Sequence, residues 1–154
     1  LDFKTGGTIG KPVRALADGY ISRIRVTNGS GYVLDVCYHN GYSTINRHLS
    51  AFLSPIAERV KKLQYENENW EVEIIPEPDE YPVKAGQRIA LSGNTGYSFG
   101  RHLHLDVFET ETGDYIDPMP FFKKNLKDTR APKADGIMLF PSAWQRSGQW
   151  KSGK

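Results

Sequence analysis

The stretch GNTGYSFGRHLHLDVFE, residues 93–109, contains two of the chain's four histidines, placed two positions apart. From Arg101 to Phe108 polar and apolar residues alternate, which is the period-two pattern of a half-buried β-strand. Side chains at i and i+2 point to the same face of a strand, so one face is polar and the other enters a core. The polar face is predicted to hold His102, His104 and Asp106, and the apolar face Leu103, Leu105 and Val107.

The pair of histidines on the open face of this strand has two interpretations. Two imidazoles on one face are a good start on a metal site or a proton-transfer site. Two exposed polar residues on a solvated sheet face explain an isolated His-x-His motif equally well. The preceding residues 92–96, SGNTG, have the composition of a turn, because Asn and Gly tolerate positive φ.

The rest of the chain predicts a mainly β fold, with an antiparallel sheet or sandwich as its core. Short alternating segments are separated by Gly, Asn and Asp turns, and Asn40-Gly41 predicts a hairpin. Strands are expected over 21–26, 31–39, 42–47 and 70–75, with another strand pair formed by Val83 and residues 87–91 around the turn 84–86. His48 is expected where a strand gives way to a loop.

One inserted α-helix is predicted, from about Pro55 to Asn67. Ser54 is a capping residue, and proline is favoured at the first helical position. Apolar residues then recur at helical spacing, namely Ile56, Val60 and Leu63.

Composition restricts the class of protein. The chain has 154 residues, enough for a core, and 20 basic against 18 acidic residues give a net charge of +2 without a basic block. Neither nucleic acid nor an anionic membrane is therefore suggested as a partner, and no apolar run is long enough for a transmembrane segment. The single Cys37 excludes an internal disulfide and a thiolate zinc cluster, and we expect it to be a buried structural thiol.

The composition changes near residue 128, which predicts a domain boundary. Residues 1–127 are expected to form one β domain. Residues 128–154 are expected to be a linker and C-terminal extension, with a strand over 137–140, and to begin another domain or act as a docking arm.

Several segments together resemble the lysostaphin-type (LytM-like) zinc metallopeptidases, in that family's order and over roughly residues 1–122. They are LDFKT at 1–5, GKPVRALADG at 10–19, RHLS at 47–50, VKAGQ at 83–87 and residues 92–104. The resemblance implies an antiparallel sheet with a groove and the hydrolysis of peptide bonds in peptidoglycan cross-links or glycine-rich bridges. The inserted helix is similar to a variant of the family found in Bacteroidetes-like envelope proteins.

The resemblance also implies the site. The family binds Zn²⁺ through a His-x-x-x-Asp motif and the second histidine of His-x-His, which match Asp2 and His104, with the third ligand expected upstream of Leu1. Either the chain begins inside this motif or the site is degenerate, and the presence of the aspartate with all three remaining histidines favours the first. His102 and His48 match the histidines that assist the reaction, one as base and one as oxyanion stabiliser, in an order that stays open.

Other polar and aromatic residues have two interpretations each. Asp106 is either a partner of a metal ligand or an exposed cross-strand charge. Tyr97 and Phe99 either line a substrate groove or pack in the core, and His39 is expected to be a structural turn residue.

Three functions compete at this stage. The first is a zinc endopeptidase that acts on peptidoglycan peptides in the periplasm or outside the cell. The second is a non-catalytic envelope module that binds peptidoglycan or regulates another hydrolase. The third is a histidine phosphocarrier, because the segments 83–87 and 17–19 are also similar to sugar-permease and lipoyl-carrier sandwiches.

Overall fold

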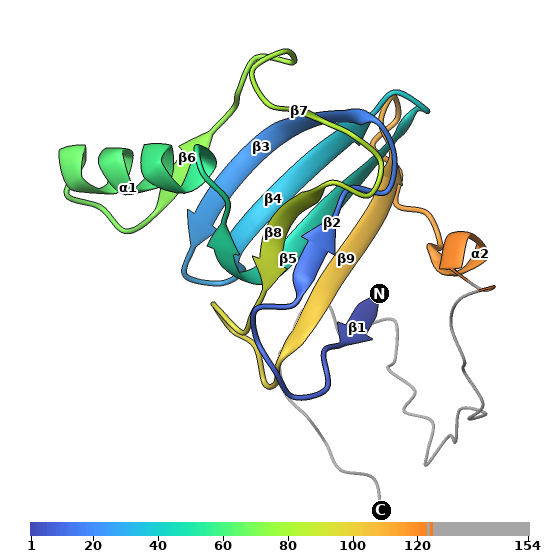
Figure 1. The fold of residues 1–154 in the computed structure, drawn as a ribbon, viewed down its shortest axis with the longest axis horizontal. Helices are drawn as coiled ribbons and strands as arrows, with labels where there is room; N and C mark the ends of the chain where they lie inside the picture. The colour runs from blue at the N-terminus through green and yellow to red at the C-terminus, as the bar shows by residue number, and fades with distance from the viewer. Residues whose placement is uncertain (123, 125–154) are drawn as a thin grey trace, which may run out of the picture. The chain divides into compact units, whose positions relative to one another are not determined.

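A single antiparallel β-sheet dominates the computed structural model, which describes residues 1–122 and 124 (Figure 1). The mainly β, antiparallel fold predicted from the sequence is therefore confirmed. The strands are β1 (Asp2–Lys4), β2 (Pro12–Arg14), β3 (Gly19–Thr27), β4 (Gly31–Tyr38), β5 (Tyr42–Phe52), β6 (Val72–Ile74), β7 (Pro82–Val83), β8 (Arg88–Ser92) and β9 (His102–Glu109).

The sheet divides along β5, and this division positions the candidate site. The main path runs β1-β9-β5-β4-β3-β6, while β8 joins β5 to β2. Residues 42–47 of β5 pair with β9, whereas residues 49–52 pair with β8. Figure 1 shows β2 and β8 on one side of this division and β1 and β9 on the other.

The central hairpin forms where the Asn-Gly signal predicts it. β4 and β5 pair antiparallel around the turn at residues 39–41, with Cys37 opposite Ser43. Gly41 has a φ of 86°, a conformation that costs glycine little because it has no Cβ. Cys37 is half-buried rather than buried, which corrects that expectation.

The hydrophobic core lies on the inner face of β3, β4 and β5 and is closed by α1, β6 and β8. Branched aliphatic side chains dominate it, as expected for strands that bury one face. The fully buried members include Ile21, Ile24, Val26, Leu34, Val36 and Leu49.

Helix α1 (Ile56–Glu66) confirms the predicted helix, with Asn67 as its C-cap. Its start differs from the expectation, because Pro55 is the N-cap residue and makes no side-chain capping bond. The Ser54 hydroxyl instead donates to the Glu58 carboxylate at 2.5 Å. A second short helix, α2 (Met119–Phe122), was not predicted, since four residues are too few to show a helical period.

One predicted strand pair is wrong. Val83 in β7 pairs with Gly19 in β3, whereas β8 pairs with β2 and β5. The turn at 84–86 therefore connects two strands that have different partners. Short segments on either side of a glycine turn fit a hairpin and a crossing connection equally well, so local sequence does not distinguish them.

Residues Leu1–Phe122 form one compact unit. The predicted linker and the strand at 137–140 lie outside the described residues, so the expected domain division at 127/128 stays a prediction. None of the helices in the described part of the chain is long and apolar enough to cross a membrane.

Candidate metal centre

Strand β9 presents its two histidines as the alternation predicts. Leu105 and Val107 are buried and Leu103 packs against the core, whereas the rings of His102 and His104 lie on the opposite face. Whether these are two isolated surface histidines or part of a site therefore depends on which other residues lie on that face.

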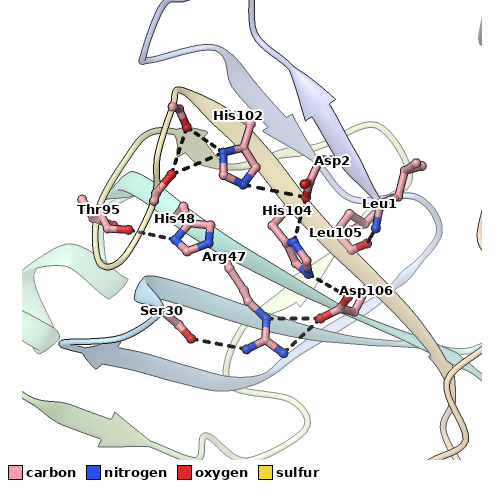
Figure 2. A network of polar contacts seen from close by, with 12 residues as sticks. Leu1, Asp2, Ser30, Arg47, His48, Thr95, His102, His104, Leu105 and Asp106 are labelled. Carbon is pink, nitrogen blue, oxygen red and sulfur yellow. Dashed lines mark hydrogen bonds and ion pairs between the residues drawn. The ribbon is translucent and has the colours of Figure 1, made fainter. Parts of the chain in front are cut away.

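Asp2 lies directly opposite His104, because β1 pairs antiparallel with β9 in that register. The Asp2 Oδ1 atom is 2.8 Å from Nδ1 of His104 and 3.7 Å from Nε2 of His102. Lys4 lies opposite His102, two positions along. The register of this short strand therefore places the Asp2 carboxylate beside His104. Figure 2 shows the three side chains pointing toward one another.

His48 lies inside β5, which corrects the expectation that the strand ends before it. It occupies the one position between the residues that pair with β9 and those that pair with β8. Its φ of 57° is unusual for a residue with a Cβ and turns the strand at the point where the sheet divides. Its backbone N–H donates to the Ser30 carbonyl at 3.1 Å instead of to either neighbouring strand. Strained backbone of this kind is common at functional sites.

The His48 ring joins the two histidines of β9. Its centroid is 5.0 Å from that of His102 and 6.2 Å from that of His104. Partial burial lowers the pKa of His48 below its ordinary value of 6.5, and the charges of His102, His104 and Arg47 lower the pKa further, while the Thr95 carbonyl opposes the shift. His48 is therefore a neutral ring near pH 7.

Hydrogen bonds to backbone carbonyls determine which nitrogen carries hydrogen in the His48 and His102 rings. Nδ1 of His48 lies 2.8 Å from the Thr95 carbonyl, and Nδ1 of His102 lies 2.7 Å from the Gly100 carbonyl. A carbonyl only accepts, so both Nδ1 atoms must carry hydrogen, which leaves Nε2 of the neutral ring with a lone pair. His104 has the opposite arrangement, since its Nε2 lies 2.9 Å from Asp106 Oδ1 and its Nδ1 faces Asp2.

The donor set fits a zinc ion. One ligand atom from each of Asp2, His102 and His104 lies within 4.8 Å of the others, and imidazole nitrogen and carboxylate oxygen are ligands that zinc favours in catalytic sites. The His104 ring lies between two carboxylates, and its contact with Asp2 requires either a proton on Nδ1 or a cation bound by both atoms. A metal ion in place of that proton would be held by both residues.

One open hollow of about 650 Å³ is lined by Asp2, His48, His102 and His104. Tyr97 and Phe99 also line it, and both are exposed, Tyr97 at 83% and Phe99 completely. The alternative that these aromatic residues pack in the core is therefore wrong. His39 is exposed at the β4–β5 turn, where its ring packs beside Tyr20.

Asp106 touches a histidine instead of being an isolated surface charge. Its side chain is 18% exposed, and besides His104 it binds Arg47, whose Nε and Nη2 donate to Oδ2 at 3.2 and 3.0 Å. Arg47, Thr95 and Ser30 were not predicted as site residues from the sequence. Arg47 adjoins His48 and so could have been noticed. Thr95 acts through its backbone carbonyl and Ser30 through a hydroxyl that contacts a residue distant in sequence, and neither contact leaves a local sequence signal.

Comparison with known proteins identifies relatives of this chain in sequence and in fold. No family model matches the chain. The glycyl-glycine endopeptidase ALE-1 of Staphylococcus capitis is 34% identical over 121 residues, which cover 75% of this chain and 26% of that protein. The chain thus spans about a quarter of the length of this curated relative.

Solved structures agree in fold as well as sequence. A zinc-containing peptidase from Vibrio cholerae has a TM-score of 0.55 at 29% identity, over 77% of this chain and 28% of that one. The catalytic domain of the antimicrobial peptidase lysostaphin from Staphylococcus simulans has a TM-score of 0.55 at 30% identity, over 79% of this chain and 76% of that one. On the strength of this shared domain, the chain belongs to the lysostaphin-type (LytM-like) zinc metallopeptidase family.

Proposed function

We propose that this chain is the catalytic part of a zinc-dependent endopeptidase that hydrolyses peptide bonds in peptidoglycan cross-links. The observation that supports this most is the convergence of Asp2, His48, His102 and His104 from three strands around one hollow. The named activities of the relatives point the same way. The proposed location is the bacterial cell envelope, in the periplasm or outside the cell, where peptidoglycan is found.

In this proposal, Asp2 and His104 would hold Zn²⁺ together with a histidine four residues before Asp2, upstream of Leu1. Zinc bound there would lower the pKa of a water molecule to about 7 and polarise the scissile carbonyl. The carboxylate and two imidazoles leave one position for water, as catalytic zinc sites require. His104 would bind the ion through Nδ1, the ring nitrogen that lies beside Asp2.

His102 and His48 supply proton transfer. Each ring presents Nε2 with a lone pair, so a neutral ring can accept the proton of the attacking water. We assign that role to His102, whose Nε2 lies 3.7 Å from Oδ1 of Asp2 and so faces the proposed metal position. His48 would stabilise the tetrahedral oxyanion or donate to the leaving amine. For either task it must first gain a proton, because its Nδ1 hydrogen is engaged by Thr95.

The hollow would hold the peptide. Tyr97 and Phe99 offer exposed aromatic surface beside the reacting groups, and extended peptide chains bind such surfaces by burying their apolar groups. We propose that these two residues form one wall of the substrate groove. The C-terminal residues 128–154 remain proposed as a linker and extension to this catalytic domain.

The experiment is digestion of purified peptidoglycan by the full-length protein, followed by chromatographic and mass-spectrometric analysis of the released peptides. Hydrolysis should stop on removal of zinc with a chelator and return on addition of zinc. New amino termini identify a cut peptide bond. Binding to peptidoglycan without any cut bond, in protein that contains zinc, would favour the non-catalytic envelope module.

A further inference from the structure

We propose that Asp106 and Arg47 are positioning residues, which together fix the His104 ring in the tautomer and orientation that present Nδ1 to the metal. This inference rests on the proposed zinc site. Asp106 lies two residues beyond His104 on the same face of β9, so its carboxylate reaches back to the ring of the residue it follows. Figure 2 shows the resulting chain from Asp2 through His104 and Asp106 to Arg47 and Ser30.

The two oxygens of Asp106 have separate partners. Oδ1 lies 2.9 Å from His104 Nε2, whereas Oδ2 accepts from both Nε and Nη2 of Arg47. Because the guanidinium engages only Oδ2, Oδ1 stays available for the imidazole. The carboxylate cannot turn without losing at least one of these bonds, and the half-buried position of both side chains reduces competition from water.

A second arginine–aspartate pair on the same sheet has a different geometry and serves as a comparison. Arg25 Nη2 donates to both oxygens of Asp35, at 2.7 and 2.8 Å, and Asp35 is 6% exposed. Within the described residues, that carboxylate binds only Arg25, so the pair acts as a structural ion pair. The Arg47–Asp106 pair differs because one oxygen is directed to a histidine.

Arg47 itself is held from behind. Its Nη1 donates to the Ser30 hydroxyl at 3.3 Å, and the Ser30 carbonyl accepts the backbone N–H of His48. Arg47 also lies directly opposite His104 in the β5–β9 pairing. The same turn thus supports the residue that orients His104 and the backbone of His48, which links the two sides of the site.

The test compares zinc affinity and the state of the His104 ring in the full-length protein. Variants are Asp106→Ala, Asp106→Asn and Arg47→Lys, with Asp35→Asn as the matched control for losing a carboxylate from an arginine pair. Asp106→Ala should weaken zinc binding by about 10–100-fold in chelator competition, the usual effect of losing such a partner. Asp106→Asn should weaken it less, since the amide oxygen still accepts from Nε2, and Arg47→Lys should also weaken it because lysine lacks the paired donors.

The second readout is the ring hydrogen itself, observed by ¹⁵N-resolved NMR of zinc-free protein. Wild type and Asp35→Asn should show a His104 Nε2–H signal protected from exchange with water, and Asp106→Ala should lose it. The inference is overturned if Asp106→Ala binds zinc as wild type does, or if wild type shows no protected Nε2–H. Wild type that binds no zinc would contradict the proposed function, while the NMR signal would still test the orientation of the ring.

Discussion

The Nδ1 atom of His104 lies 2.8 Å from Oδ1 of Asp2, although 102 positions separate the two residues in the chain. The contact follows from the pairing of β1 with β9, which places the two residues directly opposite each other. The other nitrogen of the same ring lies 2.9 Å from Asp106. An imidazole held between two carboxylates is suited to hold a cation on one side while it is oriented from the other.

Substitutions should separate metal binding from proton transfer. His104→Ala should abolish zinc retention in the full-length protein, because the site loses one of its protein ligands. His102→Ala and His48→Ala should retain nearly one zinc per chain, yet lose peptidoglycan hydrolysis by about a hundredfold or more, the scale of a proton-transfer or oxyanion group. Zinc content by mass spectrometry and initial rates on the same preparations provide the measurement.

The prediction for His102 distinguishes an assisting residue from a third histidine ligand. Its Nε2 is 3.7 Å from Asp2, close enough for it to belong to the same possible ligand set. Equal loss of zinc in all three histidine variants would show that the rings bind the ion together, and the division into ligands and assisting residues would be wrong.

The lowered pKa of His48 makes a pH-dependent prediction for the zinc-free protein. The unfolded chain takes up a proton on this residue near 6.5, while the folded protein does so only at lower pH. The contribution of His48 to the free energy of unfolding should therefore be full above pH 6.5. It should decrease as the pH falls below 6.5 toward the lower pKa of the folded protein. NMR titration of the His48 ring should give a midpoint below 6.5.

A matched variant isolates this contribution. His48→Gln removes the titrating group, so its free energy of unfolding should depend less on pH in the same window than that of wild type. A midpoint at or above 6.5 in wild type would show that burial does not dominate the environment of this ring.

Gly96 should be intolerant of a side chain. It has a φ of 73°, and a Cβ atom there would lie 2.4 Å from the backbone nitrogen of Gly31. Gly96→Ala should reduce stability by at least about 1 kcal/mol and displace Thr95, whose carbonyl holds the His48 ring. The turnover of the remaining folded protein should fall as well, since a misplacement of 1 Å can cost about a hundredfold in rate.

Gly29→Ala is the control for the same turn region, because a Cβ at Gly29 meets no atom within 4 Å and its φ is not in the left-handed region. Thermal unfolding and turnover should both stay near wild type in that variant. Equal effects of the two substitutions would mean that the close approach at Gly96 does not matter to the site.

The exposed aromatic wall gives a prediction about substrate binding. Tyr97→Ser and Phe99→Ser should leave the free energy of unfolding within about 0.5 kcal/mol of the wild-type value, because neither ring is buried. KM for a peptide substrate should rise about tenfold or more, since burying one aromatic side chain contributes roughly 1.5–3 kcal/mol. Zinc content should not change.

Tyr65 supplies the comparison for these variants. It is 74% exposed on α1 and does not line the hollow, so Tyr65→Ser should leave KM unchanged. An unchanged KM in the Tyr97 and Phe99 variants would remove both residues from the proposed groove.

Local sequence patterns were sufficient for much of the fold. The alternation through His102 and His104, the Asn40-Gly41 hairpin and the apolar spacing of α1 each report a local structure, and each is confirmed. The partners of β7 and β8 were not predictable in the same way, because strand pairing depends on contacts distant in sequence.

The candidate site shows the same limit. Its polar residues were identified by their resemblance to a family motif, while the structure adds the groups that orient them. The turn at His48 arises because β5 changes partner at that residue, which no local pattern encodes. Likewise the roles of Arg47 and Ser30 depend on the register of three strands.

The most direct test of the central claim is a crystal structure of the zinc-loaded full-length protein, with anomalous diffraction collected at the zinc absorption edge. We expect a single strong peak within about 2.0–2.2 Å of an Asp2 carboxylate oxygen and of His104 Nδ1, the range for zinc with oxygen and nitrogen ligands. His102 and His48 should face the same space through Nε2 without binding the ion. A peak bound to other residues, or zinc-saturated crystals without a peak between Asp2 and His104, would contradict the account.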